Sequence, residues 1–158
     1  MFDTKTTSYS SVEMMPSHRD FVRELSEACR KHGLRFGLYF SLIDWHHPDY
    51  PHYGDKFHPM RNNPAAQNSH RDFDRYLDFL HGQIREICTN YGKLDLLWFD
   101  FAYDHLRGEA WGGTALMDMV RSLQPDVLID NRIEVSGEWC GSLYQCNPTP
   151  YHGDFVTP

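Results

Sequence analysis

One carboxylate, Asp100, has the sequence surroundings expected of a catalytic nucleophile. It ends the apolar stretch 94–100, and Trp98 lies two residues earlier, on the same face if this stretch is a strand. A carboxylate at the end of an apolar strand is partly desolvated and can attack the anomeric carbon of a sugar, while an aromatic ring beside it can stack on that sugar. The same pair could be a loop-capping Asp and a core Trp, so position alone leaves both roles open.

Two other apolar stretches also carry polar side chains near their carboxyl ends. Tyr39 lies within the stretch 35–42. The third stretch ends in Asp130, Asn131 and Arg132. A guanidinium has a fixed fork of donors that can hold a sugar hydroxyl or orient a carboxylate. A surface salt bridge is the commoner role of arginine, and it remains the alternative.

A long segment, 44–64, is rich in proline and histidine. Loops of this length within a compact domain are usually functional. Its histidines suggest a metal site, but their spacing matches no helix-based pattern such as His-Glu-x-x-His. The loop carries Trp45, His46, His47, His52 and His58. Its histidines could instead be hydrogen-bonded to the backbone, and His46 or His47 could contact a sugar.

Apolar spacing predicts helices and strands that alternate along the chain. Ser17 is expected to cap the first helix, and Gly33 is expected to end it in a left-handed conformation. The predicted helices cover 17–32, 65–90 and 114–123, and the predicted strands cover 35–42, 94–100 and 127–130.

This alternation indicates an α/β fold with parallel strands joined by right-handed crossovers. It fits either a doubly wound sheet or part of a (β/α)8 barrel. A whole barrel takes about 250 residues and eight strands, so 158 residues with three clear strands would supply about half of one. In both architectures ligands bind at the carboxyl ends of the strands, so the polar side chains should meet at one edge.

Composition excludes several classes of function. The net charge of −7, without a run of like charges, argues against nucleic-acid binding, and no apolar stretch is long enough to span a membrane. The sequence contains no serine nucleophile elbow, phosphate-binding loop or dinucleotide fingerprint. No Cys-x-x-Cys pair occurs; Cys29 and Cys88 suit small core positions, and Cys140 and Cys146 could pair in an exported protein.

Several motifs resemble those of family 29 glycoside hydrolases, the α-L-fucosidases. The strand and loop 36–42 and 44–48 resemble the Gly-Leu-Tyr strand of that family and the loop after it. The opening 1–7 resembles the stretch after the family's third barrel strand. The other matching segments are 91–92 with 96–100, and 131–132 leading to 153–158, so the resemblance covers essentially the whole chain.

The resemblance implies that residues 1–158 are a central fragment, about half, of a TIM-like (β/α)8 catalytic barrel. The implied reaction is hydrolysis of terminal α-L-fucosidic bonds in glycans or glycoconjugates, with retention and without a cofactor. Asp100 would be the nucleophile. A fucosylated oligosaccharide or glycoconjugate would be the partner, and relatives are commonly secreted, periplasmic or lysosomal. We expect substrate contacts from Tyr39, Trp45, His46, Trp98 and Arg132.

The chain also departs from the family pattern. Phe101 stands where the family usually has Gly or another small or apolar residue after the nucleophile. The family's His-His-Asp-Gly motif would precede Met1, and the Glu that acts as acid/base in many members would follow Pro158. We therefore expect the isolated chain to be inactive and to self-associate through its open edges. A non-catalytic fucose-binding fragment and a metal-dependent hydrolase that uses the histidine-rich loop are the alternatives.

Overall fold

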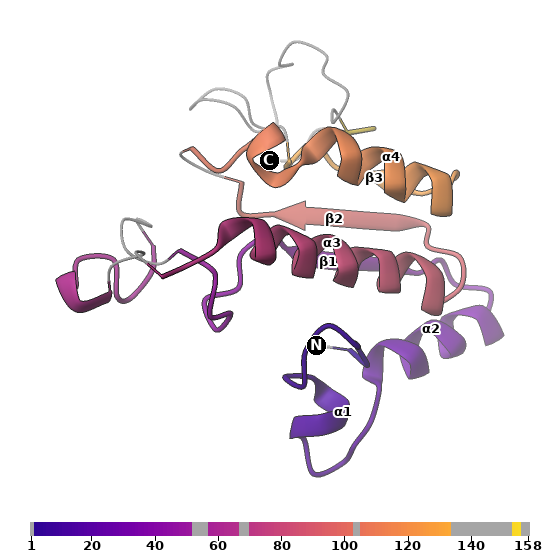
Figure 1. Ribbon diagram of the computed structural model, residues 1–158. Coiled ribbons are helices and arrows are strands. Elements are labelled where there is room, and N and C mark those ends of the chain that lie inside the picture. Colours follow the sequence, from indigo (N-terminus) through magenta and orange to yellow (C-terminus); the bar gives the residue numbers. More distant parts are fainter. Residues whose placement is uncertain (1, 52–56, 67–69, 103–104, 134–152, 156–158) are drawn as a thin grey trace.

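The computed structural model describes residues 2–51, 57–66, 70–102, 105–133 and 153–155, and its centre is a three-stranded parallel sheet. The strands are β1 (Gly37–Ser41), β2 (Leu96–Asp100) and β3 (Leu128–Ile129), in the order β1-β2-β3. All three lie within the strands that apolar spacing predicts, so the α/β prediction with parallel pairing is confirmed. Figure 1 shows the helices that connect them.

Two crossover helices, α3 (Phe73–Asn90) and α4 (Gly113–Leu123), pack against each other and cover one face of the sheet. The prediction that α3 begins at residue 65 is wrong. Asp72 caps the helix by accepting the N–H of Arg75 at 3.3 Å, and the short 3-10 turn η1 (Pro64–Ala66) stands apart before it.

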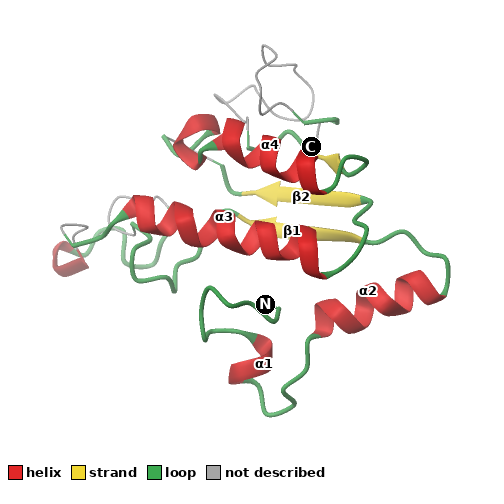
Figure 2. Cartoon of the chain, turned by 45° about the vertical axis from the view of Figure 1, so that its right-hand side comes forward, coloured by secondary structure: helices red, strands yellow, loops and turns green. Residues whose placement is uncertain are grey.

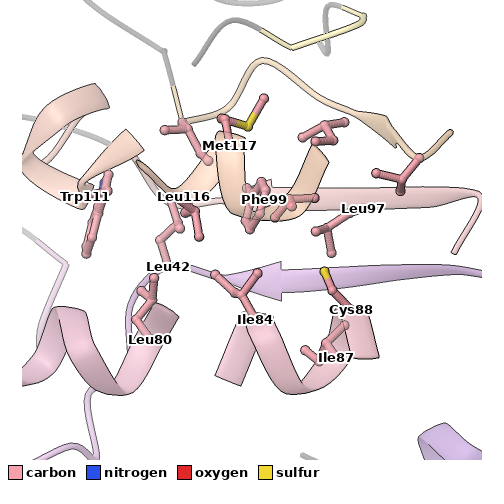
Figure 3. Close-up of a cluster of buried hydrophobic side chains, with 14 of the residues drawn as sticks. Leu42, Leu80, Ile84, Ile87, Cys88, Leu97, Phe99, Trp111, Leu116 and Met117 are labelled. Atoms are coloured by element: carbon pink, nitrogen blue, oxygen red, sulfur yellow. The ribbon is translucent and has the colours of Figure 1, made fainter. Parts of the chain in front are cut away.

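The core lies between these helices and the sheet (Figure 3). Leu97 and Phe99 point into it from β2, because alternate residues of a strand face the same side. Each fully buried side chain of this size contributes about 1.5–3 kcal/mol. Burial also raises the pKa of the Cys88 thiol to about 11, so it stays a neutral core group. The labelled core residues are Leu42, Leu80, Ile84, Ile87, Cys88, Leu97, Phe99, Trp111, Leu116 and Met117.

The N-terminal helices are α1 (Ser11–Met14) and α2 (Phe21–Lys31), and Figure 2 shows α2 set apart from the sheet. Asp20, not Ser17, is the cap of α2, since its carboxylate accepts the N–H of Arg23 at 3.1 Å. Gly33 ends the helix with φ +66°, as predicted. The apolar side chains of α2 are partly exposed: Phe21 is 40% and Leu25 is 57% accessible.

The segment 153–155 lies beside β3 and extends the sheet. Asp154 donates its N–H to the carbonyl of Ile129 at 2.7 Å, and its carboxylate accepts the Ile129 N–H at 2.8 Å. Phe155 forms a parallel bridge with Asp130. A β-carbon on Gly153 would lie 2.1 Å from the Asp130 carbonyl oxygen, so only glycine fits this close approach.

The remaining described element is the 3-10 turn η2 (Gly108–Trp111), which leads into α4. Cys29 and Cys88 are free thiols, while Cys140 and Cys146 lie outside the described residues. Across the described ranges, no helix has both the length and the apolar character needed to cross a lipid bilayer.

Candidate active site

The register between β1 and β2 places four polar or aromatic side chains on one face of the sheet. Tyr39 pairs with Trp98, and Ser41 pairs with Asp100. These residues alternate with Leu97 and its neighbours, which face the helices, so the four side chains share the face that α3 and α4 leave uncovered. The prediction that polar groups of different strands meet at the carboxyl ends is confirmed for β1 and β2.

Asp100 accepts hydrogen bonds on both carboxylate oxygens. The Tyr39 hydroxyl donates to Oδ2 at 2.7 Å, and the backbone N–H of Phe101 donates to Oδ1 at 2.8 Å. Arg132 Nη1 lies 3.3 Å from Oδ1, and the Asp100 side chain is 22% exposed. Donors from three chain segments therefore fix the direction of a carboxylate that stays open to a ligand.

Tyr39 acts as a donor to Asp100 over the whole physiological range. Desolvation of its hydroxyl, and then the hydrogen bond to Asp100, raise the pKa of Tyr39 to about 12, although the residue as a whole is 56% exposed. A phenol with this pKa keeps its proton at neutral pH. Its proton therefore always lies between the two oxygens and steadies the carboxylate.

Asp130 is a buried carboxylate close enough to Asp100 and Arg132 to interact with their charges. It is 1% exposed, and it accepts the N–H of Phe99 on Oδ1 at 3.0 Å. Its second oxygen, Oδ2, is buried without a hydrogen-bond partner among the described residues. Burial, which outweighs the opposing hydrogen bonds and the charge of Arg132, raises the pKa of Asp130 to about 7. The sequence put Asp130 at a strand end but carries no signal for this burial.

Trp98 lies on the same face of the sheet as Asp100. Its ring meets that of Phe155 at a centroid distance of 5.8 Å in an edge-to-face arrangement. The segment 153–155, which β3 holds in place, therefore joins β2 through this aromatic pair.

Trp45 and His46 follow the end of β1, in the loop after the strand. The His46 ring stacks on Tyr9 with centroids 3.9 Å apart, and Trp45 is 44% exposed. With Phe101 these residues line a cavity of about 390 Å³. Tyr9 is far away in sequence, and no motif could have placed it here.

The other described histidines of the loop form local structural bonds. His47 Nδ1 accepts the N–H of Asp49 at 3.1 Å, its ring packs on Phe79, and burial lowers its pKa. His58 Nδ1 accepts the N–H of Met60 at 3.0 Å. His52 lies outside the described residues. Among the residues that are described, no three His, Cys, Asp or Glu side chains gather as metal ligands would.

The sequence profile of the family described as "Alpha-L-fucosidase" matches residues 1–153. The chain belongs to the α-L-fucosidase family. It is 49% identical to the human tissue α-L-fucosidase over 145 residues, which are 92% of this chain and 27% of that protein. The chain thus spans about a quarter of the length of this curated relative.

Solved structures of other α-L-fucosidases share its fold. Isoenzyme 1 from Paenibacillus thiaminolyticus is 49% identical, with a TM-score of 0.90 over 99% of this chain and 36% of that one. AlfC from Lactobacillus casei, solved with the α-L-fucose product, is 33% identical, with a TM-score of 0.68 over 88% of this chain and 44% of AlfC. AlfC has also been solved in complex with Fuca(1,6)GlcNAc.

Proposed function

We propose that residues 1–158 supply the nucleophile side of a retaining α-L-fucosidase site that hydrolyses terminal α-L-fucosidic bonds. The observation that carries this proposal is the Asp100 carboxylate at the carboxyl end of β2, oriented by Tyr39 and Arg132 while still open to a ligand. Family membership supports fucose as the sugar. The substrate class in this proposal is a fucosylated oligosaccharide or glycoconjugate, consistent with the ligands of AlfC.

The proposed reaction has two displacements. In the first, an Asp100 oxygen forms a bond to C1 of fucose while the bond from C1 to the leaving-group oxygen breaks, and that oxygen takes a proton from a general acid. In the second, water attacks C1, gives a proton to the same group acting as base, and releases Asp100. Trp98 lines the fucose pocket, Tyr39 and Arg132 hold Asp100, and the resemblance places the acid/base Glu after Pro158.

We further propose that the whole chain, residues 1–158, is part of a (β/α)8 catalytic barrel. Strand order follows chain order, and both crossover helices cover one face, as they do in such barrels. The other face carries the site, which in a closed barrel would be the interior above the strands. The TM-score of 0.90 with the Paenibacillus thiaminolyticus enzyme supports this arrangement.

The test is hydrolysis of an aryl α-L-fucoside by the complete polypeptide that contains residues 1–158. Asp100→Ala should lower kcat/KM by about 1,000-fold or more, because no other group can form the glycosyl ester. Asp126→Ala is the matched control: its carboxylate is 79% exposed and lies before β3, so activity should be unchanged. NMR should show α-fucose as the first product.

Four results would contradict the proposal. Full activity of Asp100→Ala would remove the nucleophile assignment, and β-fucose as the first product would exclude retention. Fucose binding without any turnover by the complete polypeptide would favour the carbohydrate-binding alternative. Loss of turnover on chelation would instead favour a metal-dependent hydrolase.

A further inference from the structure

The cavity beyond the strand ends has aromatic walls contributed by three separate segments. Tyr9 comes from the N-terminal loop, Trp45 from the loop after β1, and Phe101 from the residue after β2. Their exposed fractions are 39%, 44% and 40%, so each presents ring surface to a ligand. His46 stacks flat on Tyr9, with an interplanar angle of 13°, and this contact fixes the Tyr9 ring.

Phe101 is held in an unusual backbone conformation at this wall. Its φ is +73°, a value that bulky residues rarely adopt because it strains the backbone. Its N–H donates to Asp100 Oδ1 at 2.8 Å. The hydrogen bond that orients the Asp100 carboxylate therefore also fixes the backbone of Phe101. It couples the cavity wall that the Phe101 ring forms to the reacting carboxylate.

The cavity lies outward of the fucose contacts along the strands. Tyr39 and Trp98 each precede the strand end by two residues, whereas Ile43 to His46 and Phe101 follow it. Ser41 and Asp100 form the last register pair, so the carboxylate lies at the boundary. In the proposed reaction the leaving group lies on the side of C1 opposite the attacking Asp100 oxygen, so for a sugar bound over Tyr39 and Trp98 we expect it to point out past the strand ends toward the loops.

We propose that this cavity, lined by Tyr9, Trp45, His46 and Phe101, is the subsite for the leaving-group side of the substrate, and that it takes a sugar or aryl ring. The inference rests on the proposed fucosidase function. A volume of about 390 Å³ suits one ring with its substituents. Flat aromatic faces bind the apolar faces of sugars and other rings, and Asp44 and Ser41 in the same wall bring polar oxygens near ring hydroxyls.

The test compares two substrates in the complete polypeptide that contains residues 1–158. α-L-Fucosyl fluoride has a leaving group too small to reach the cavity, and fucosyl-α(1,6)-N-acetylglucosamine has a ring that fills it. Trp45→Ala deletes a ring that is 44% exposed, so its loss should leave the fold intact. Phe21→Ala is the matched control, since its ring is 40% exposed and lies on α2, away from the cavity.

Trp45→Ala should lower kcat/KM for the disaccharide by about 5–10-fold and change that for the fluoride less than about twofold. Trp45→Phe should restore most of the loss, and Phe21→Ala should change neither substrate. Equal losses of kcat/KM on both substrates, or no loss on the disaccharide, would overturn the subsite proposal. If the unmodified protein fails to hydrolyse even the fluoride, the proposed function itself fails.

Discussion

Two carboxylates on neighbouring strands have opposite surroundings. Asp100 accepts bonds from Tyr39 and Phe101 and remains partly exposed, whereas Asp130 is buried and leaves one oxygen without a partner among the described groups. Strand position predicted Asp100, because the end of an apolar strand is visible in the sequence. The burial of Asp130 was not predictable, since it depends on the segment 153–155 lying against β3.

This difference gives a stability prediction for Asp130→Asn. The pKa of Asp130 is raised from 3.8 to about 7, so the folded protein binds this proton more tightly than the unfolded chain. This proton binding stabilises the folded protein fully below pH 4, and the stabilisation is lost as the pH rises toward 7. Relative to Asp130→Asn, the unmodified protein should therefore lose on the order of 3 kcal/mol of unfolding free energy between pH 4 and 7.

Urea unfolding of both proteins across this pH range measures the effect. Asp126→Asn is the control, because its exposed carboxylate should leave the pH dependence of stability unchanged. Parallel pH curves for the unmodified protein and Asp130→Asn would show that Asp130 ionises normally, which would contradict the assigned environment.

At the scale of elements, periodicity predicted the type and order of the main helices and strands. It failed at two helix starts, where a local contact decides: Asp20 and Asp72 each accept a backbone N–H, and neither cap is distinguishable from its polar neighbours in sequence. The apolar face of α2 is largely exposed. Apolar spacing shows that a face needs a partner, but it does not say which segment provides it.

The exposed face of α2 leads to a prediction for the 158-residue chain. Phe21 and Leu25 on α2 are exposed, and β1 is an edge strand among the described residues, so a second copy can cover this side. We expect sedimentation velocity to show species larger than the monomer. Leu25→Glu should shift them toward the monomer by adding one negative charge to the face.

Lys31→Gln is the matched control on the same helix, because it changes the net charge by the same amount and removes no apolar surface. Association should persist in this variant. A monomeric unmodified chain, or equal dissociation by both substitutions, would contradict an apolar contact through α2.

At the scale of the whole molecule, the sequence predicted an α/β chain with its site at the carboxyl ends of parallel strands. Three motifs in order carried the resemblance, and the family profile over residues 1–153 confirms it. The leaving-group cavity could not be predicted, because Tyr9, Trp45 and Phe101 belong to segments that only the fold brings together. The left-handed φ of Phe101 has no sequence signal either, since glycine is the residue expected there.

The central claim is that Asp100 forms a covalent bond to C1 of fucose, and trapping that bond tests it most directly. A 2-fluoro-fucosyl fluoride reacts with a nucleophile to form an ester that hydrolyses slowly, because fluorine at C2 destabilises the transition states of both steps. Peptide mass spectrometry of the complete polypeptide should find one added fluorofucosyl group on the peptide that contains Asp100, and none in Asp100→Asn. A label on another carboxylate, or labelling that survives in Asp100→Asn, would contradict the account.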